Sequence, residues 1–203
     1  MNSRIVTGIM LSATLGCGFV MIACAAAQAQ YRAQPQYQAP DRYGGSVTNF
    51  FGFRFYTIIP RTLVNYTGPH QPGTIIINTS ERRLYLVLAH GQALRYGVGV
   101  GRDGFSWSGT NTISMKREWP DWTPPEDMLR RRPDLPRHMV GGADNPLGAR
   151  ALYLGSSLYR IHGSNEPETI GQAVSSGCIR MTNDDVIDLY DRVKVGGTVV
   201  VTH

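Results

Sequence analysis

Short apolar runs that alternate with turn-forming residues dominate the chain from Gly73 onward. The runs are rich in Ile, Val, Leu and Tyr, and Gly, Pro, Asn and Ser separate them, which is typical of short β-strands joined by turns. Because the turns between successive runs are short, we expect mostly antiparallel neighbours. The expected strands are residues 74–78, 83–88, 94–100, 113–118, 149–154, 159–162 and 198–202.

One stretch near the C-terminus has helical periodicity instead. Val186, Tyr190 and Val193 recur at the spacing of one helix face. Thr182, followed by acidic residues that suit the positive end of a helix dipole, is a typical helix start, and glycines at 196–197 end the helix. The whole pattern predicts a mostly β fold of the α+β class with one or two short helices.

The first 29 residues have the pattern of an export signal. Arg4 precedes a long uncharged apolar stretch that ends in Ala27-Gln28-Ala29, which is typical of a cleaved signal peptide. Two alternatives stay open: an uncleaved anchor, because the stretch is long enough to cross a bilayer, and a lipoprotein signal acylated at Cys24. We expect residues 30–72 to form a spacer and an N-terminal strap, and residues 73–203 to form the globular domain.

A proline-rich insertion interrupts the strand pattern between residues 119 and 142. Long loops in compact domains often cover a binding site, so we expect this insertion to act as a lid. Trp107, Trp119 and Trp122 would line the groove beneath it or, equally well, fill the core.

Composition and charge narrow the class of protein. With 42% hydrophobic and 17% charged residues, the chain is not a disordered polyampholyte. The net charge is +5, and loss of Arg4 with the signal leaves 19 basic minus 15 acidic residues, or +4. A basic surface would aid encounter with acidic envelope polymers, and solubility alone explains it equally well.

The three cysteines cannot all pair within the chain. Removal of residues 1–29 would take Cys17 and Cys24 and leave only Cys178. A lone cysteine in an exported protein is an inert buried side chain, a partner for another chain, or a reactive nucleophile.

The neighbours of Cys178 favour the nucleophile. A thiol is mostly protonated near neutral pH, and a nearby imidazole can accept its proton. His162 ends a predicted strand sixteen positions earlier, and the intervening loop can bring the two together. Gly177 lets backbone N–H groups face a developing oxyanion, while Ser175 and Ser176 help to fix the turn. A core thiol beside a core histidine stays open on this pattern alone.

Other chemistries lack their motifs. One cysteine and scattered histidines offer no zinc ligand set, and no Gly-x-Ser-x-Gly elbow of a serine hydrolase occurs. The glycines at residues 97–101 lack the following helix and the spacing of a dinucleotide-binding loop. We therefore expect no metal and no organic cofactor.

Two segments together resemble the signature of the L,D-transpeptidases, the YkuD-type catalytic domain of the ErfK/YbiS/YcfS/YnhG group. They are His162-Gly163-Ser164-Asn165-Glu166-Pro167 and Ser175-Ser176-Gly177-Cys178-Ile179-Arg180-Met181. The likeness continues over residues 73–101 and Asn145-Pro146-Leu147-Gly148, and covers about residues 73–202. Ser176 stands where many members carry histidine, which argues for His162 as the base. The resemblance implies an L,D-transpeptidase-like β-sandwich with a lid insertion.

The resemblance also implies a mechanism on peptidoglycan stem peptides. Cys178 would attack the carbonyl of the third residue of a tetrapeptide stem, D-alanine would leave, and the thioester would pass to an amine of a second stem as a 3→3 cross-link. His162 would take the thiol proton, and the Gly163 carbonyl would orient the imidazole. Backbone N–H groups of Ser176, Gly177 and Cys178 would form the oxyanion hole.

Arg180, Ser175 and Trp107 are the expected substrate-binding residues. For Arg180 the alternative is a structural role, because arginines often tie loops to carboxylates or carbonyls. Expected partners are stem peptides, an envelope protein as another acyl acceptor, and carbapenem-type inhibitors, with no nucleic acid. The expected location is the periplasm. Two other functions stay open: a carboxypeptidase or endopeptidase using the same cysteine and histidine, and a non-catalytic wall-binding protein.

Overall fold

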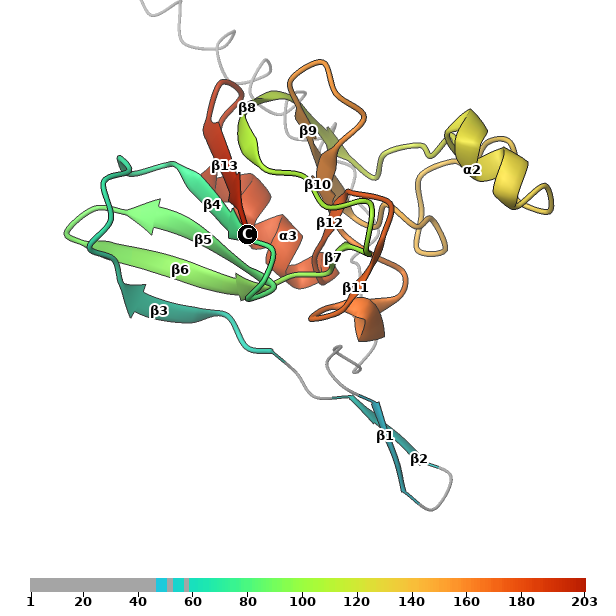
Figure 1. The fold of residues 1–203 in the computed structure, drawn as a ribbon, viewed down its shortest axis with the longest axis horizontal. Coiled ribbons are helices and arrows are strands. Elements are labelled where there is room, and N and C mark those ends of the chain that lie inside the picture. Colours follow the sequence, from blue (N-terminus) through green and yellow to red (C-terminus); the bar gives the residue numbers. More distant parts are fainter. Residues whose placement is uncertain (1–46, 51–52, 57–58) are drawn as a thin grey trace, which may run out of the picture. The chain divides into compact units, whose positions relative to one another are not determined.

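The computed structural model describes residues 47–50, 53–56 and 59–203, with side chains from residue 59 onward (Figure 1). The predicted signal peptide and residues 30–46 of the predicted spacer and strap lie outside these residues. Strands β1 (Val47–Phe50) and β2 (Phe53–Tyr56) pair as an antiparallel hairpin. No helix in the described part of the chain is long and apolar enough to span a membrane.

Nine strands form one mixed sheet in the order β12-β10-β9-β8-β13-β4-β5-β6-β3 (Figure 1). Most neighbours are antiparallel, but β13 with β4 and β10 with β12 are parallel. The bounds are β3 (Thr62–Asn65), β4 (Ile75–Asn78), β5 (Arg83–Leu88), β6 (Gln92–Gly97), β8 (Gly109–Glu118), β9 (Arg150–Leu154), β10 (Arg160–His162), β12 (Ile179–Arg180) and β13 (Thr198–Thr202). Two further strands, β7 (Val100–Gly101) and β11 (Ala173–Ser175), pair in parallel as a separate ladder.

Strand β8 joins the two halves of the sheet. Residues 109–112 pair with β13, and residues 113–118 pair with β9. The register shifts between Ile113 and Met115, and such bulges bend a strand and increase its twist. The sheet therefore turns back on itself, and its two halves bury a common core.

The core combines apolar side chains from both halves of the sheet with one face of helix α3 (Asn183–Arg192). Thr182 caps this helix by accepting a hydrogen bond of 3.2 Å from the Asp185 N–H. Val186 and Leu189 are fully buried, and α3 packs against β9 and β10. The buried set includes Ile75, Ile77, Leu84, Leu86, Ile113, Leu152, Leu154, Ile161, Ile179, Met181, Val199 and Val201.

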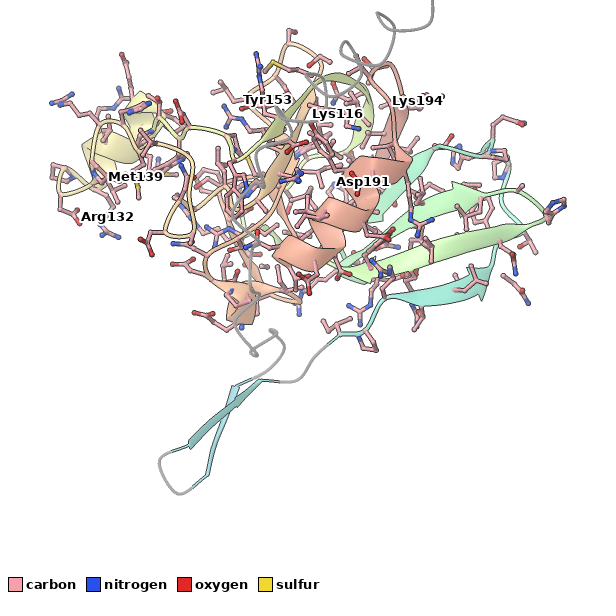
Figure 2. All side chains as sticks on the ribbon, turned by 180° about the vertical axis from the view of Figure 1, so that it is seen from behind. Lys116, Arg132, Met139, Tyr153, Asp191 and Lys194 are labelled. Carbon is pink, nitrogen blue, oxygen red and sulfur yellow. The ribbon has the colours of Figure 1, made fainter. Side chains whose placement is uncertain are left out.

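A lysine from β8 fastens the C-terminal end of α3. Lys116 Nζ donates hydrogen bonds of 2.5 Å to the Tyr190 carbonyl and 2.7 Å to the Val193 carbonyl. The last carbonyls of a helix lack intrahelical donors, so this cation satisfies them. Figure 2 shows Lys116 beside the helix that carries Asp191.

The predicted mostly β architecture with one or two short helices is confirmed, with two α-helices in the described residues. The predicted strands and α3 lie close to their expected positions. One feature differs from the expected division of the chain. Part of the predicted strap, β3, pairs with β6 as an edge strand, with Leu63 opposite Leu94. The main sheet therefore begins at Thr62 and not at residue 73.

The proline-rich insertion has a closed base and a short helix, α2 (Glu126–Arg131). Trp122 and Met139 exchange two backbone hydrogen bonds of 2.8 Å, and Asp121 Oδ1 accepts one of 2.9 Å from the Gly141 N–H. Helix α2 stands away from the sheet at one end of the domain (Figure 1), with Met139 near it (Figure 2).

Candidate active site

Two short parallel strands place the predicted nucleophile and base on one face. Ile161 of β10 pairs with Ile179 of β12, and both side chains are buried in the core. Because successive side chains in a strand point to opposite faces, His162 and the residue before Ile179, Cys178, face away from that core. The register puts His162 level with Arg180, so the imidazole lies diagonally across from Cys178.

The His162 imidazole is buried and held in one orientation. Its Nδ1 lies 2.5 Å from the Gly163 carbonyl oxygen. A carbonyl can only accept, so Nδ1 carries the hydrogen and the lone pair is on Nε2. Burial, helped by the positive charges of Arg180 and Arg160, lowers the pKa of His162 to about 3, and only the bond to Gly163 opposes this shift. The imidazole is therefore a neutral potential base at physiological pH.

Gly163 sits where no larger residue fits. A Cβ at this position would collide with Asn183 Oδ1 and lie 3.0 Å from the Ala149 N–H nitrogen. Asn183, in the first turn of α3, accepts a 2.9 Å bond from Ala149 N–H and donates one of 3.2 Å to the Ser164 carbonyl. Helix α3 thus fixes the backbone that carries the acceptor of His162.

Ser175 organises the loop that carries Cys178. Its hydroxyl donates a 2.6 Å hydrogen bond to the Cys178 carbonyl and accepts one of 3.1 Å from the Gly177 N–H. Gly177 has a φ of +105°, a conformation that glycine adopts without strain. A Cβ there would also come within 2.6 Å of the Tyr159 ring.

Two aromatic rings hold the same loop from the side. Trp107 Nε1 donates a 2.8 Å hydrogen bond to the Gly177 carbonyl. The Trp107 ring stacks on Tyr159 with centroids 4.5 Å apart and planes 7° from parallel. The close approach of Tyr159 to Gly177 completes a rigid support for the residue before the thiol.

The Cys178 thiol is half-buried, and its Sγ lies 3.7 Å from the Leu158 carbonyl oxygen. Burial raises the pKa of this thiol, while hydrogen bonds from the backbone and side chain of Arg160, and the charges of Arg160 and Arg180, act in the opposite direction. Burial is the largest of these effects, so the resting group is a thiol. The predicted nucleophile and the predicted base are therefore both neutral in the free protein.

The expected substrate-binding residues all have partners within the protein. Arg180 Nη1 pairs with Glu166 Oε2 at 2.8 Å and reaches Thr169 Oγ1 at 3.5 Å. Ser175 and Trp107 hold the nucleophile loop as described above. Ser176 Oγ accepts a long hydrogen bond of 3.5 Å from Arg102. Contact of these residues with substrate stays a prediction, whereas the structure shows their contacts within the protein.

The Gly177 N–H, expected in the oxyanion hole, donates to Ser175 Oγ in this structure. It would have to exchange that acceptor in order to face an oxyanion. Residues 59–203 contain no cluster of three or more side chains that would hold a metal ion.

Comparison with known proteins identifies the family. The family model described as the YkuD L,D-transpeptidase catalytic domain matches residues 72–201. The chain belongs to this family. It is 34% identical over 184 residues to the probable L,D-transpeptidase ErfK/SrfK of Escherichia coli K12, covering 82% of this chain and 58% of that protein. It is 35% identical over 162 residues to the probable L,D-transpeptidase YbiS of the same strain, covering 75% and 48%. The chain thus spans about half the length of these relatives.

Solved structures agree on the fold. An L,D-transpeptidase from Mycobacterium smegmatis superposes with a TM-score of 0.52 at 16% identity, covering 77% of this chain and 66% of that one. One from Mycobacterium tuberculosis H37Rv gives 0.51 at 15% identity, covering 74% and 61%. The YkuD fold is therefore shared. The family-model match over residues 72–201 includes every residue of the site described above.

Sequence reasoning missed one charged residue of this YkuD site, Arg160. It precedes His162 by two positions, so strand alternation alone would have placed both on the same face. Its position beside Cys178 follows only from the register between β10 and β12. Tyr159, which supports Gly177, was missed for the same reason.

Proposed function

We propose that this protein is a peptidoglycan L,D-transpeptidase that forms 3→3 cross-links through a thioester on Cys178. The observation that carries the proposal is the placement of Cys178 and His162 on one face, with Nδ1 of the imidazole tied to the Gly163 carbonyl. That bond leaves Nε2 as the proton acceptor. Membership of the YkuD family supports peptidoglycan stem peptides as the substrate class.

In the acylation step, Sγ attacks the carbonyl carbon of the third residue of a tetrapeptide stem. The thiol proton passes to His162 Nε2 as the S–C bond forms, and the carbonyl oxygen takes up negative charge. Backbone N–H groups of Ser176 and Cys178 face this oxyanion, joined by Gly177 once Ser175 releases it. Collapse breaks the C–N bond, and the imidazolium gives its proton to the departing D-alanine nitrogen.

In the second step, an amine attacks the thioester carbonyl and His162 accepts a proton from it. The C–S bond then breaks, and the imidazolium returns this proton to the Cys178 sulfur. The amine of a second stem gives the 3→3 cross-link, and a lysine of an envelope protein would give an attached protein. Water would give a shortened stem. The half-buried position of the thiol limits the access of water to the thioester.

The test is mass spectrometry of peptidoglycan fragments incubated with the purified protein. We expect 3→3 dimers and released D-alanine, and neither product with Cys178→Ala. Shortened monomers without dimers would indicate a carboxypeptidase or endopeptidase activity and contradict the transpeptidase activity. Unchanged fragments would indicate a non-catalytic wall-binding protein.

We further propose that carbapenems acylate Cys178. One L,D-transpeptidase was solved in complex with imipenem, and it shares the fold with a TM-score of 0.50 at 14% identity, covering 64% of this chain and 58% of that one. Intact-protein mass spectrometry should show one imipenem adduct, located on the Cys178 peptide. A stoichiometric adduct on Cys178→Ala would contradict the assignment.

Export to the periplasm through residues 1–29 completes the proposal. Cell fractionation and N-terminal sequencing of the protein from its host would test it, with a mature N-terminus at Gln30 as the expected result. A full-length protein in the cytoplasmic fraction would overturn it.

A further inference from the structure

Arg160 begins strand β10, two residues before His162 and on the same face of the strand. The register between β10 and β12 pairs Ile161 with Ile179, which puts Arg160 level with Cys178, and its positive charge lowers the pKa of the thiol against the effect of burial. On the other side, β10 pairs with β9 so that Arg160 lies opposite Tyr153. The guanidinium carbon sits 5.0 Å from the centroid of the Tyr153 ring. Strands β9 and β10 and the residue before β12 thus bring Tyr153, Arg160 and Cys178 into one row on the face of the active site.

The Arg160 guanidinium has no carboxylate partner within the described residues. Its Nε is buried and without a hydrogen-bond partner there. Arg180, the arginine expected to meet substrate, is by contrast already paired with Glu166 at 2.8 Å. A buried or half-buried cation without a counter-charge is costly, and a fork of guanidinium donors matches a carboxylate.

We propose that Arg160 binds the terminal carboxylate of the donor stem, the carboxylate of the D-amino acid that leaves. This inference rests on the proposed transpeptidase function and specifies how the site selects its donor. Only a nitrogen and one Cα separate the attacked carbonyl carbon from that carboxylate carbon, so the two lie about 3 to 4 Å apart. An arginine that lies level with Cys178 across the two strands is therefore within reach of it.

Other carboxylates of the stem fit this position less well. The side-chain carboxylate of a diaminopimelate at the third position is several bonds further from the attacked carbonyl. A pentapeptide stem has an amide where the tetrapeptide has its carboxylate, so Arg160 would face a neutral group. The protein should therefore prefer tetrapeptide donors over pentapeptide donors, and this preference should depend on the Arg160 side chain.

The experiment compares three synthetic tetrapeptide donors: the free acid, the C-terminal amide, and a donor amidated only on the diaminopimelate side chain. The rate of donor consumption, as kcat/KM by mass spectrometry, is measured for the unaltered protein, Arg160→Gln, Arg160→Lys and the distant control Arg95→Gln. Loss of Arg160 also affects the thiol itself. That effect is common to all donors and cancels in the ratio of acid to amide.

The unaltered protein should favour the free acid over the C-terminal amide by about 10- to 100-fold, the range for a hydrogen bond between charged groups. Arg160→Gln should bring this ratio close to one, Arg160→Lys should keep part of it, and Arg95→Gln should keep all of it. An unchanged ratio in Arg160→Gln, or discrimination against only the side-chain amide, would overturn the inference. If the unaltered protein consumes no donor at all, the proposed function fails instead. Alkylation of Cys178 by iodoacetamide in each folded variant, checked by circular dichroism, reports that the site is intact.

Discussion

The resting protonation state of Cys178 can be tested by titrating its reactivity. Many thiol enzymes hold a thiolate–imidazolium pair, whose reactivity hardly changes around neutral pH. Here burial raises the pKa of the thiol above its ordinary value of 9.0 and lowers that of His162 to about 3. We therefore expect the free enzyme to react as an ordinary buried thiol.

The expected magnitude follows from the thiolate fraction. For a pKa of 9.0 or higher, at most about 1% of the thiol is ionised at pH 7, and at most about half at pH 9. The alkylation rate should then rise between about 50- and 100-fold from pH 7 to pH 9. A pKa of 9.0 gives the smaller ratio, and any higher pKa moves it toward the larger one.

The assay is alkylation by iodoacetamide, a neutral reagent, at a series of pH values. Peptide mass spectrometry separates modification of Cys178 from that of Cys17 and Cys24, and Cys178→Ala provides the blank. Circular dichroism at each pH checks that the protein stays folded. A rate that changes less than about fivefold between pH 5 and pH 9 would falsify the neutral pair and require a preformed thiolate.

Three further substitutions test other parts of the argument. His162 has a pKa of about 3 in the folded protein and 6.5 in the unfolded chain, so its contribution to stability is present above pH 6.5 and is lost as pH falls toward 3. The denaturant midpoint of His162→Gln should therefore depend less on acid than that of the unaltered protein. Parallel curves of midpoint against pH would contradict this. Trp107→Phe keeps the stacked ring but loses the hydrogen bond to the Gly177 carbonyl. We expect about tenfold slower acylation, with a melting temperature only a few degrees lower. An unchanged single-turnover rate would show that Trp107 does not position the loop. Lys116→Met leaves the Tyr190 and Val193 carbonyls without their charged donor. It should lower the free energy of unfolding by about 1–3 kcal/mol in a urea titration. An equal loss in Lys116→Arg would attribute the effect to packing and not to charge.

Local signals explain why most of the fold was predictable. Helix α3 was expected over about 182–193 and runs from Asn183 to Arg192, because Thr182 caps it and its apolar residues recur at helical spacing. Strands β4 and β5 combine apolar runs with a clear turn between them. Strand β3 was missed because Thr62–Asn65 gains its hydrogen bonds from β6, which is distant in the sequence. Such an edge strand carries little apolar signal of its own.

The features of the candidate active site also fall into those that local sequence predicts and those that only the fold shows. Cys178, His162 and Gly163 belong to motifs whose residue types express their chemistry, so they could be named from the sequence. The partner of Arg180 could not be, because Glu166 reaches it only when the loop folds back over β12. The engagement of the Gly177 N–H by Ser175 depends on the torsion angles of one turn. Contacts that depend on register or on torsion angles need the folded structure.

The electrostatics of the site explain what its arginines do in the proposed mechanism. A positive potential stabilises a thiolate but destabilises an imidazolium, so Arg160 and Arg180 cannot promote the ion pair of Cys178 and His162. They favour species with net negative charge, namely the oxyanion formed by attack and the carboxylate of the donor. The same potential keeps protonated His162 strongly acidic, in line with its pKa of about 3. Once the imidazole has taken the thiol proton, it is therefore a strong acid toward the departing nitrogen, and this drives breakdown of the intermediate toward the thioester.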